Sequence, residues 1–358
     1  MLPSEAELHG LRRSLAGGSA PQPGERALID HIRRRLPAPP PTLLIGPGDD
    51  AAVIVPERGA MQVLTTDAIV EGAHFDRRFS SLSDIGYKAL AVNISDIAAM
   101  GARPEFALLS LILPDGFTLA DLDALLDGLL DMASASRVAL AGGNISRSPG
   151  PLIVDMTVTG SVRPRRILTR SGGRPGDALY VTGSIGGAAA GLDFLKVRGS
   201  EGPKGPDHPD LSDLVKRHQR PEPRIRIGML LGRNRAASAC MDLSDGLADA
   251  VRQIAEASGT GATVDATALP LDPAAAAWFE SAMADPLLAA VSGGDDYELL
   301  FAVPRKARGR LRMVQSLARG VPITHIGELT AGPAIQLLRG GAGIPMPMGF
   351  SHFHATNQ

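Results

Sequence analysis

Cysteine is almost absent from this 358-residue sequence, since Cys240 is its only one. A single thiol excludes an intramolecular disulfide framework and a metal site built from cysteines alone. We therefore expect a reducing compartment, and the predicted localisation is cytoplasmic. The first residues, MLPSEAELHG, carry acidic side chains and lack the apolar stretch of a secretory signal, in agreement with that expectation.

Aromatic residues and net charge are also scarce. Phe, Trp and Tyr make up 4% of the sequence, and the formal net charge is −2. Few aromatics argue against platforms on which nucleic-acid bases stack, and a near-neutral charge gives no electrostatic reason to bind nucleic acid or an anionic membrane. No apolar run approaches the length of a bilayer span. We expect a globular protein with no nucleic-acid or membrane partner.

The order of the predicted elements indicates two domains. Helical spacing predicts helices over 24–36, 81–101 and 118–136, and apolar runs predict strands at 105–113 and elsewhere. Helices and strands mix without strict βαβ regularity, so the predicted class is α+β rather than a doubly wound sheet. The expected division is a flexible tail at 1–23, an N-terminal domain at 24–162, a C-terminal domain at 163–345 with a polar loop at 198–210, and a C-terminal segment at 346–358.

Acidic residues recur in unexpected surroundings. In LLIGPGDDAAVIV, residues 43–55, Asp49 and Asp50 interrupt an apolar run, and a carboxylate removed from water is costly unless a cation or hydrogen-bond donors accompany it. Acids also follow or interrupt apolar runs in TTDAIVEGAHF, NISDIAAMG, DLSDG and SGGDDYELLF. Each motif alone also fits an ordinary turn or helix cap. Together they favour a shared cation site.

The donor types predict a hard cation and a phosphate substrate. Carboxylates and hydroxyls without thiols favour Mg²⁺ or Mn²⁺ over zinc, and proteins commonly hold Mg²⁺ with one or two carboxylates and phosphate oxygens. The sequence contains no Gly-x4-Gly-Lys-Ser/Thr phosphate loop, so metals would have to hold the phosphates. GSIGGAAAG at 183–191 and Arg170 are weaker phosphate candidates, since each also fits an ordinary structural role.

The helix predicted at 81–101 carries polar residues of two kinds. Asn93 and Asp96 are three positions apart and therefore share a face that should be buried and should need a partner. Asp84 and Lys88 fit a surface ion pair at i,i+4, and Ser83 suits the N-cap.

Taken together, the motifs resemble the thiamine-monophosphate kinase family, which belongs to the superfamily of aminoimidazole ribonucleotide synthetase. The resemblance spans roughly residues 24–353. It rests on nine segments in order: GPGDDAAV, TTDAIVEGAHF, DIGYKALAVNISDIAAMGARP, LAGGN, LTRSGGRPGD, VKRHQRPEPR, MDLSDGLADA, SGGDDYELLF and MGFSHF. The family fold implied is two domains with the site in the cleft between them, and an N-terminal sheet that pairs with its mate in a homodimer.

The resemblance also implies roles for residues, by position. Catalytic contacts would come from Asp67, Asp96 and Asp245. Ligands of several Mg²⁺ ions would be Asp50, Thr65, Thr66, Asp67, Asp96, Asn144, Asp242 and Asp245. Contacts to ATP would come from Gly143, Asn144, Arg170 and Ser244. The surroundings of thiamine monophosphate would include His74, Asp295 and Phe350.

The implied chemistry is in-line transfer of the ATP γ-phosphoryl group to thiamine monophosphate, which gives thiamine diphosphate. Two positions depart from the family pattern. Asn144 stands where Asp is frequent, which removes one negative charge, and Asp295 stands where Glu is common, one methylene shorter. Another ATP-using enzyme of the same superfamily and a non-catalytic nucleotide-binding homologue remain the alternatives.

Overall fold

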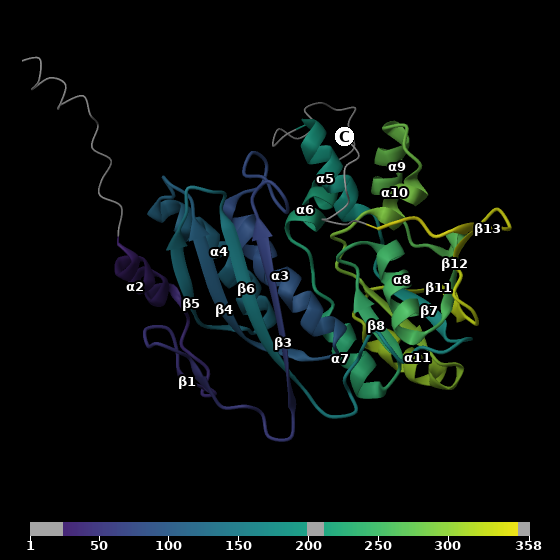
Figure 1. The fold of residues 1–358 in the computed structure, drawn as a ribbon, viewed down its shortest axis with the longest axis horizontal. Helices are drawn as coiled ribbons and strands as arrows, with labels where there is room; N and C mark the ends of the chain where they lie inside the picture. The colour runs from purple at the N-terminus through teal and green to yellow at the C-terminus, as the bar shows by residue number, and fades with distance from the viewer. Residues whose placement is uncertain (1–23, 199–210, 350–358) are drawn as a thin grey trace, which may run out of the picture.

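The computed structural model describes residues 24–198 and 211–349. The predicted tail at 1–23, most of the predicted loop at 198–210, and Phe350 with the rest of the C-terminal segment lie outside the described residues. Figure 1 shows two adjacent bodies, each with its own sheet and helices. The predicted mixture of helices and strands is therefore confirmed.

The N-terminal domain is built on a sheet of order β3-β6-β4-β5, in which β4 and β5 run parallel and the other pairs antiparallel. Helices α3 and α4 pack against each other on one face of this sheet, where they bury an apolar core (Figure 1). The elements are α2 (Glu25–Arg35), β1 (Leu43–Ile45), β2 (Val53–Ile54), β3 (Met61–Val70), α3 (Leu82–Ala99), β4 (Arg103–Leu113), α4 (Leu119–Ser136), β5 (Ala139–Arg147) and β6 (Ile153–Val162).

The helix predicted at 81–101 is present as α3, but its N-cap lies two positions earlier than predicted. Ser81, not Ser83, is its N-cap, and the Ser81 hydroxyl accepts a hydrogen bond of 3.1 Å from the backbone N–H of Asp84. Such a cap satisfies one of the unpaired amides of the first turn. The helix is buried along most of its length because it lies between the N-terminal sheet, α4 and the C-terminal domain.

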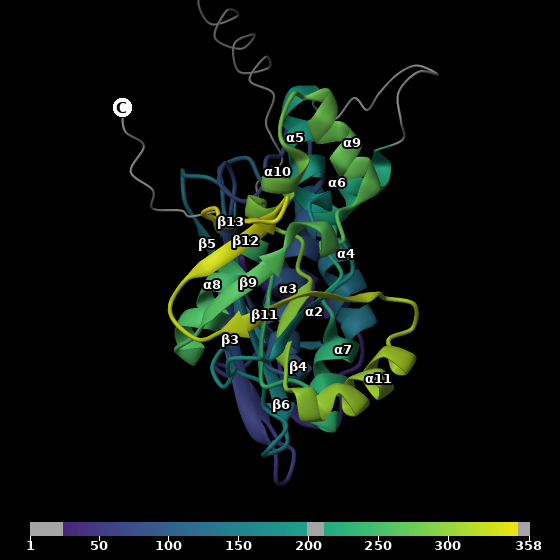
Figure 2. The ribbon, with the colours of Figure 1, turned by 90° about the vertical axis from the view of Figure 1, so that its right-hand side faces the viewer.

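The C-terminal domain contains a sheet of order β13-β12-β9-β11-β7-β10-β8 (Figure 2). Its pairs are antiparallel except for β12 with β9. The elements are β7 (Ala178–Thr182), α5 (Gly187–Arg198), α6 (Ser212–Gln219), α7 (Ile225–Asn234), β8 (Ala239–Asp242), α8 (Leu247–Ser258), β9 (Gly261–Asp265), α9 (Pro273–Ser281), α10 (Pro286–Ser292), β10 (Leu299–Val303), α11 (Arg308–Leu317), β11 (Ile323–Thr330), β12 (Ile335–Arg339) and β13 (Ala342–Pro345), with short 3₁₀ turns at Ala266–Ala268 and Arg305–Ala307.

Helix α3 joins the two domains. It packs against α6, α7 and β8 of the C-terminal domain as well as against its own sheet. Its carboxyl half therefore lies beside the end of β8, and β8 ends at Asp242. Residues 146 positions apart in the sequence, Asp96 and Asp242, are brought to the same boundary in this way.

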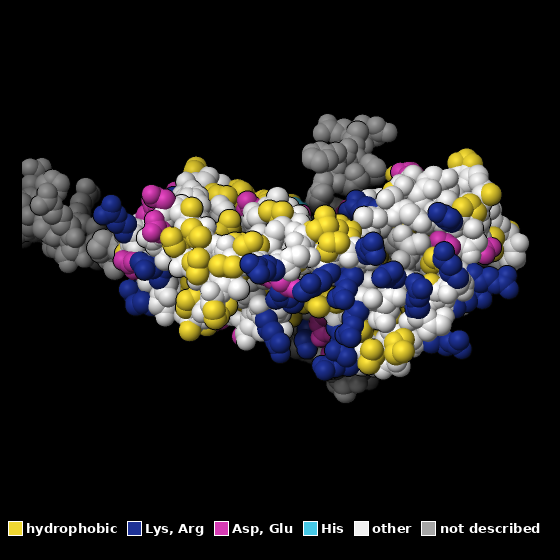
Figure 3. All heavy atoms as spheres, turned by 90° about the horizontal axis from the view of Figure 1, so that it is seen from below, with side chains coloured by type: hydrophobic (Ala, Val, Ile, Leu, Met, Phe, Trp, Pro, Cys, Tyr) yellow, Lys and Arg dark blue, Asp and Glu magenta, His cyan; other side chains and the backbone are white. Residues whose placement is uncertain are grey.

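The open face of the N-terminal sheet is apolar in part. Leu64 on β3 is 68% exposed and Leu108 on β4 is 41% exposed, on the side away from α3. Seen from below, hydrophobic side chains spread over the N-terminal half of the molecule, whereas Lys and Arg side chains gather nearer the middle and the C-terminal half (Figure 3). Among the described helices, none combines the length and apolarity that crossing a bilayer requires.

Candidate active site

A cleft of about 890 Å³ lies between the two domains. The N-terminal domain contributes β3, the segment after it and α3. The C-terminal domain contributes α5, the turn after β8 and the loop before β10. Eight of the predicted site residues line this one cavity: Asp67, His74, Asp96, Arg170, Asp242, Ser244, Asp245 and Asp295.

Aspartates from both domains meet at one end of the cleft. The Thr65 hydroxyl donates to Asp96 Oδ2 at 2.5 Å, and the Ser95 hydroxyl donates to Asp242 Oδ2 at 2.7 Å. Asn93 holds the strand beside them, since its Oδ1 accepts from the backbone N–H of Asp67 at 2.9 Å. These contacts fix the acids on β3, α3 and β8 without any positive side chain bonded to them.

Crowding changes the acidity of this cluster. Burial, followed by the charge of Asp96, raises the pKa of Asp67 to about 6, and Asp155 and Asp245 add to the effect. Burial and Asp96 also raise the pKa of Asp242 to about 7, although Ser95 and Arg170 act in the opposite direction. Carboxylates that resist ionisation when empty would ionise readily beside a cation. We call Asp67, Asp96, Asp242 and Asp245 the acid cluster.

The donor set fits a hard cation, although no preformed ligand shell is present. Within residues 24–198 and 211–349, no three His, Cys, Asp or Glu side chains converge closely enough to hold a metal by themselves. Mg²⁺ typically takes only one or two carboxylates from the protein and fills its octahedron with water and phosphate oxygens. The Thr65 hydroxyl and the carboxylates of Asp67, Asp96 and Asp242 are oxygen donors of the kind that Mg²⁺ binds.

A second hollow, of about 1040 Å³, is lined by three other predicted site residues. It lies between α2, the turn at 46–52 and the strands β4, β5 and β6, and Asp50, Gly143 and Asn144 line it. The structure therefore does not place Asp50 and Asn144 in the interdomain cleft. Asp155 lines the hollow as well, and the Thr66 hydroxyl lies 3.3 Å from Asp155 Oδ1. Strand β3 thus presents Thr65 to one site and Thr66 to the other.

His74 and Arg170 have local partners in the cleft wall. His74 Nδ1 accepts a hydrogen bond of 3.1 Å from the backbone N–H of Val70, which fixes the turn that follows β3. Arg170 lies at the other side and donates from Nη1 to Gln253 Oε1. Both side chains line the cavity, so they are placed to contact a ligand without further rearrangement of the chain.

Asp295 lines the same cleft on the loop before β10, and its partner comes from the N-terminal domain. Lys88 Nζ donates to Asp295 Oδ2 at 2.9 Å, and only 5% of the Lys88 side chain is exposed. The predicted surface pair of Lys88 with Asp84 is wrong, because Asp84 instead accepts from Arg220 Nε at 2.6 Å. The i,i+4 spacing predicted that Asp84 and Lys88 would pair with each other. In the structure each pairs with a residue of the C-terminal domain instead.

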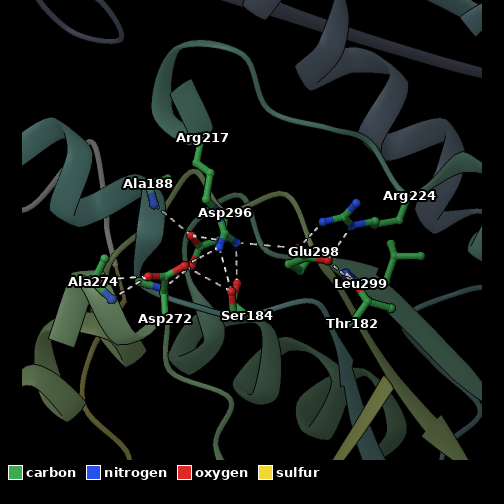
Figure 4. Close-up of polar contacts among 12 residues, drawn as sticks. Thr182, Ser184, Ala188, Arg217, Arg224, Asp272, Ala274, Asp296, Glu298 and Leu299 are labelled. Carbon is green, nitrogen blue, oxygen red and sulfur yellow. Dashed lines mark hydrogen bonds and ion pairs between the residues drawn. The ribbon is translucent and has the colours of Figure 1, made fainter. Parts of the chain in front are cut away.

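A buried polar network supports the loop that carries Asp295. The next residue, Asp296, accepts from the backbone N–H groups of Gly186 at 2.7 Å and Ala188 at 3.1 Å, and burial raises its pKa to about 7 despite the nearby Arg217. Figure 4 shows Arg217 pointing to Asp296, Ser184 and Asp272, and Arg224 pointing to Glu298. The network ties α5, α6 and β10 together behind the cleft.

Three residues of the site were missed by the sequence reasoning: Ser95, Asp155 and His218. Asp155 left a signal, since it is a lone acid in the apolar strand LIVDMTVTG. Ser95 is completely buried beside Asp242, and His218 is 2% exposed beside Asp295. A serine or a histidine on a helix has no sequence feature that marks such a contact.

Comparison with known proteins identifies the family of this chain. The family model for the N-terminal domain of AIR synthase related proteins matches residues 48–162, and the model for their C-terminal domain matches residues 174–339. The thiamine-monophosphate kinase of Escherichia coli K12 is 40% identical over 333 residues, which cover 92% of this chain and 98% of that protein.

Solved structures of similar proteins support the same family. The crystal structure of thiamine-monophosphate kinase from Stenotrophomonas maltophilia K279a superposes with a TM-score of 0.76 at 35% identity, over 87% of this chain and 95% of that chain. A structure described as AaThiL complexed with AMPPCP and TMP superposes with a TM-score of 0.73 at 31% identity, over 92% of this chain and 97% of that chain.

Proposed function

The chain belongs to the thiamine-monophosphate kinase family, and from that premise we propose that it transfers the γ-phosphoryl group of ATP in line to thiamine monophosphate, assisted by a cluster of Mg²⁺ ions. It is a thiamine-phosphate kinase with ATP as co-substrate. The observation that supports the mechanism is the acid cluster, in which aspartates from both domains line one cleft and the pKa values of Asp67 and Asp242 are raised.

The acceptor needs little activation. A phosphate monoester has its second pKa near ~6, so its oxygen is already largely anionic at neutral pH. The obstacle is repulsion between two polyanions. Mg²⁺ held by the acid cluster would supply the neutralising charge. The chain's own contribution is to hold the acids at fixed positions: Thr65 donates to Asp96, Ser95 donates to Asp242, and Asn93 accepts from the backbone N–H of Asp67.

The proposed residue roles divide between the two cavities. Asp67, Asp96 and Asp245 would hold ions in contact with the reacting phosphates, and Thr65 and Asp242 would complete that set. Asp50, Thr66 and Asn144 would hold ions at the second hollow, where Asp155 is a further oxygen donor. Contacts to ATP are proposed for Gly143, Asn144, Arg170 and Ser244, and contacts to thiamine monophosphate for His74, Asp295 and Phe350, the last outside the described residues.

Asn144 is the departure that matters most for this proposal. It lines the second hollow, and its Nδ2 donates to Ser146 Oγ at 3.0 Å, which leaves its carbonyl oxygen available as a ligand. A neutral amide attracts a cation less than a carboxylate does. We therefore expect one ion to bind more weakly here than with Asp, and Asn144→Asp to lower the Mg²⁺ concentration needed for half-maximal turnover.

We also propose a homodimer that pairs the open faces of two N-terminal sheets. Leu64 and Leu108 support it, because both are exposed on that face. Sedimentation or light scattering of the purified protein tests it, and a monomer at micromolar concentration contradicts it. The boundaries 24–162 and 163–345 and a cytoplasmic location stay predictions of the same kind.

One assay tests the central proposal. Purified protein is incubated with ATP, Mg²⁺ and thiamine monophosphate, and thiamine diphosphate and ADP are quantified by chromatography. We expect equal amounts of both products, and none when Mg²⁺ is chelated. Tight ATP binding without either product would instead favour the non-catalytic nucleotide-binding alternative, which Asn144 keeps open.

A further inference from the structure

Lys88 is a buried cation whose charge is matched from another domain. It lies on α3 of the N-terminal domain, and Asp295 lies 207 positions later on the loop before β10. A buried ammonium is costly unless it is paired, so this contact must persist in the folded protein. The resemblance gave Asp295 a role but gave none to Lys88.

The Asp295 carboxylate is held from several sides. Its Oδ2 accepts from Lys88, and its Oδ1 lies 3.2 Å from the Tyr297 hydroxyl. Its backbone has φ +69°, an unusual conformation for a residue with a side chain, and its N–H donates to the Ser244 carbonyl at 2.8 Å. The neighbouring Gly294 packs so closely that a Cβ there would lie 2.6 Å from the same carbonyl.

The negative charge of Asp295 is compensated by the ammonium group of Lys88. Burial disfavours its ionised form, but the Lys88 charge outweighs burial and holds the pKa of Asp295 well below its usual range. His218 itself is kept neutral, because burial and the Lys88 charge lower its pKa. Its Nδ1 lies 3.4 Å from Asp295 Oδ2 but forms no hydrogen bond with the described atoms. The group therefore carries one positive and one negative charge.

A neutral pair attracts a cationic ring only weakly, whereas an oriented carboxylate oxygen remains a good hydrogen-bond acceptor. Helix α3 also places this pair relative to the acid cluster. Lys88 and Asp96 are eight residues apart, which is about 12 Å along the axis of an α-helix. Helix α3 thus positions both Lys88 and Asp96.

We propose that Lys88 is a positioning residue of the thiamine monophosphate site, which holds Asp295 as an oriented hydrogen-bond acceptor and removes its action as a counter-charge for the thiazolium ring. The proposal rests on the proposed function and deepens it. Lys88 acts through Asp295 and does not itself contact the substrate.

The test compares Lys88→Met with Lys216→Met, a matched change at an exposed lysine on α6 outside the cleft. We expect Lys88→Met to raise the KM for thiamine monophosphate about tenfold or more, with the KM for ATP changed less than about twofold, as loss of one charge-assisted hydrogen bond predicts. Lys216→Met should change neither. Equal shifts in both KM values, or no shift in either, would overturn the proposal.

The double variant Lys88→Met/Asp295→Asn separates positioning from mere stability. It removes both charges but keeps an oxygen acceptor at position 295. We expect its melting temperature to return toward that of the wild type while the KM for thiamine monophosphate stays raised. Recovery of both quantities would show a purely structural pair and contradict the proposal.

Lys88→Arg covers the case in which Lys88→Met does not fold. It keeps the charge but lengthens and flattens the donor, so we expect a raised KM with a near-normal melting temperature, and an unchanged KM would count against positioning. The wild type is assayed first. Absence of thiamine diphosphate there would defeat the proposed function itself, whereas wild-type turnover with unchanged KM in the variants would defeat only this inference.

Discussion

The acid cluster and Asp295 both line the interdomain cleft, yet their electrostatics are opposite. At the acid end the pKa values of Asp67 and Asp242 are raised. At the other end Asp295 is ion-paired with Lys88, and its pKa is lowered. Helix α3 supplies a residue to each, Asp96 to the acid cluster and Lys88 to the ion pair, so the difference does not come from the supporting element.

The contrast separates acids that hold the structure from acids that await a ligand. The charge of Asp295 is compensated by the Lys88 ammonium when the chain folds, and only its hydrogen-bonding capacity is left for a ligand. An aspartate that is crowded by other acids is satisfied only when a cation arrives from solution. The contrast therefore identifies the acid cluster as the expected metal site. Each of the following experiments tests this difference between the acid cluster and the Asp295–Lys88 pair.

The largest expected effect lies at the acid end. Asp67→Asn and Asp96→Asn each remove a carboxylate from the cluster, and we expect turnover of thiamine monophosphate to fall by more than about 100-fold, as loss of a metal-site residue commonly does. Steady-state measurement of ADP release checks this. Asp115→Asn, at an exposed turn after β4, is the control and should leave turnover unchanged. Near-normal rates in both cluster variants would contradict the assignment.

The next effect lies at the paired end and concerns stability. Asp295→Asn leaves the Lys88 ammonium buried without its counter-charge, and we expect a loss of about 3 kcal/mol in the free energy of unfolding. Urea denaturation measures it. At the acid end the same kind of change, Asp67→Asn, removes a crowded charge and should leave the metal-free protein as stable as the wild type or more so. If both variants lose equal stability, the contrast between the two ends is wrong.

A smaller effect distinguishes the two ends by pH. Asp67 and Asp242 have raised pKa values in the folded protein, about 6 and about 7, so their contribution is fully present below about pH 4 and is lost as pH rises through those values. Asp295 has a lowered pKa, so its contribution is present above pH 4 and is lost only in stronger acid. Between pH 4 and 7 the acid cluster should respond and Asp295 should not, and Asp296, whose pKa burial raises to about 7, adds to the response in the same window.

The measurement is the melting temperature of the metal-free protein across that range. We expect it to fall with rising pH by an amount that corresponds to on the order of 1 kcal/mol, after allowance for solvent screening at Asp67. The slope should flatten in Asp67→Asn. A slope that persists unchanged in that variant would place its origin elsewhere.

The smallest effect sets the baseline away from both ends. Thr118 caps α4, and its hydroxyl accepts from the backbone N–H of Asp121 at 3.1 Å in a capping box. We expect Thr118→Ala to cost about 1 kcal/mol of stability and to leave kcat and both KM values unchanged. A kinetic change here would mean that stability alone alters the assays, and the larger effects would then need correction for it.

Local patterns predicted much of this protein, and the failures have a common cause. The helix at 118–136 and the strand at 105–113 follow from periodicity, and the structure contains both as α4 and β4. Lys88 was assigned to the wrong partner because spacing along one helix reports only neighbours on that helix. The separation of Asp50 from Asp67 was missed for a related reason, since both motifs have the same appearance but line different cavities.

The sequence by itself determined the kind of protein: its mixed elements, its store of oxygen donors, and a family whose motifs occur in order along the chain. These depend on residue types and short spacings, which the sequence states directly. Only the tertiary structure decided which aspartates share a cleft, which one has an ammonium beside it, and how α3 spans both ends. Charge interactions depend on distances in space and on burial, and both are set when two domains pack together, not by position along the chain.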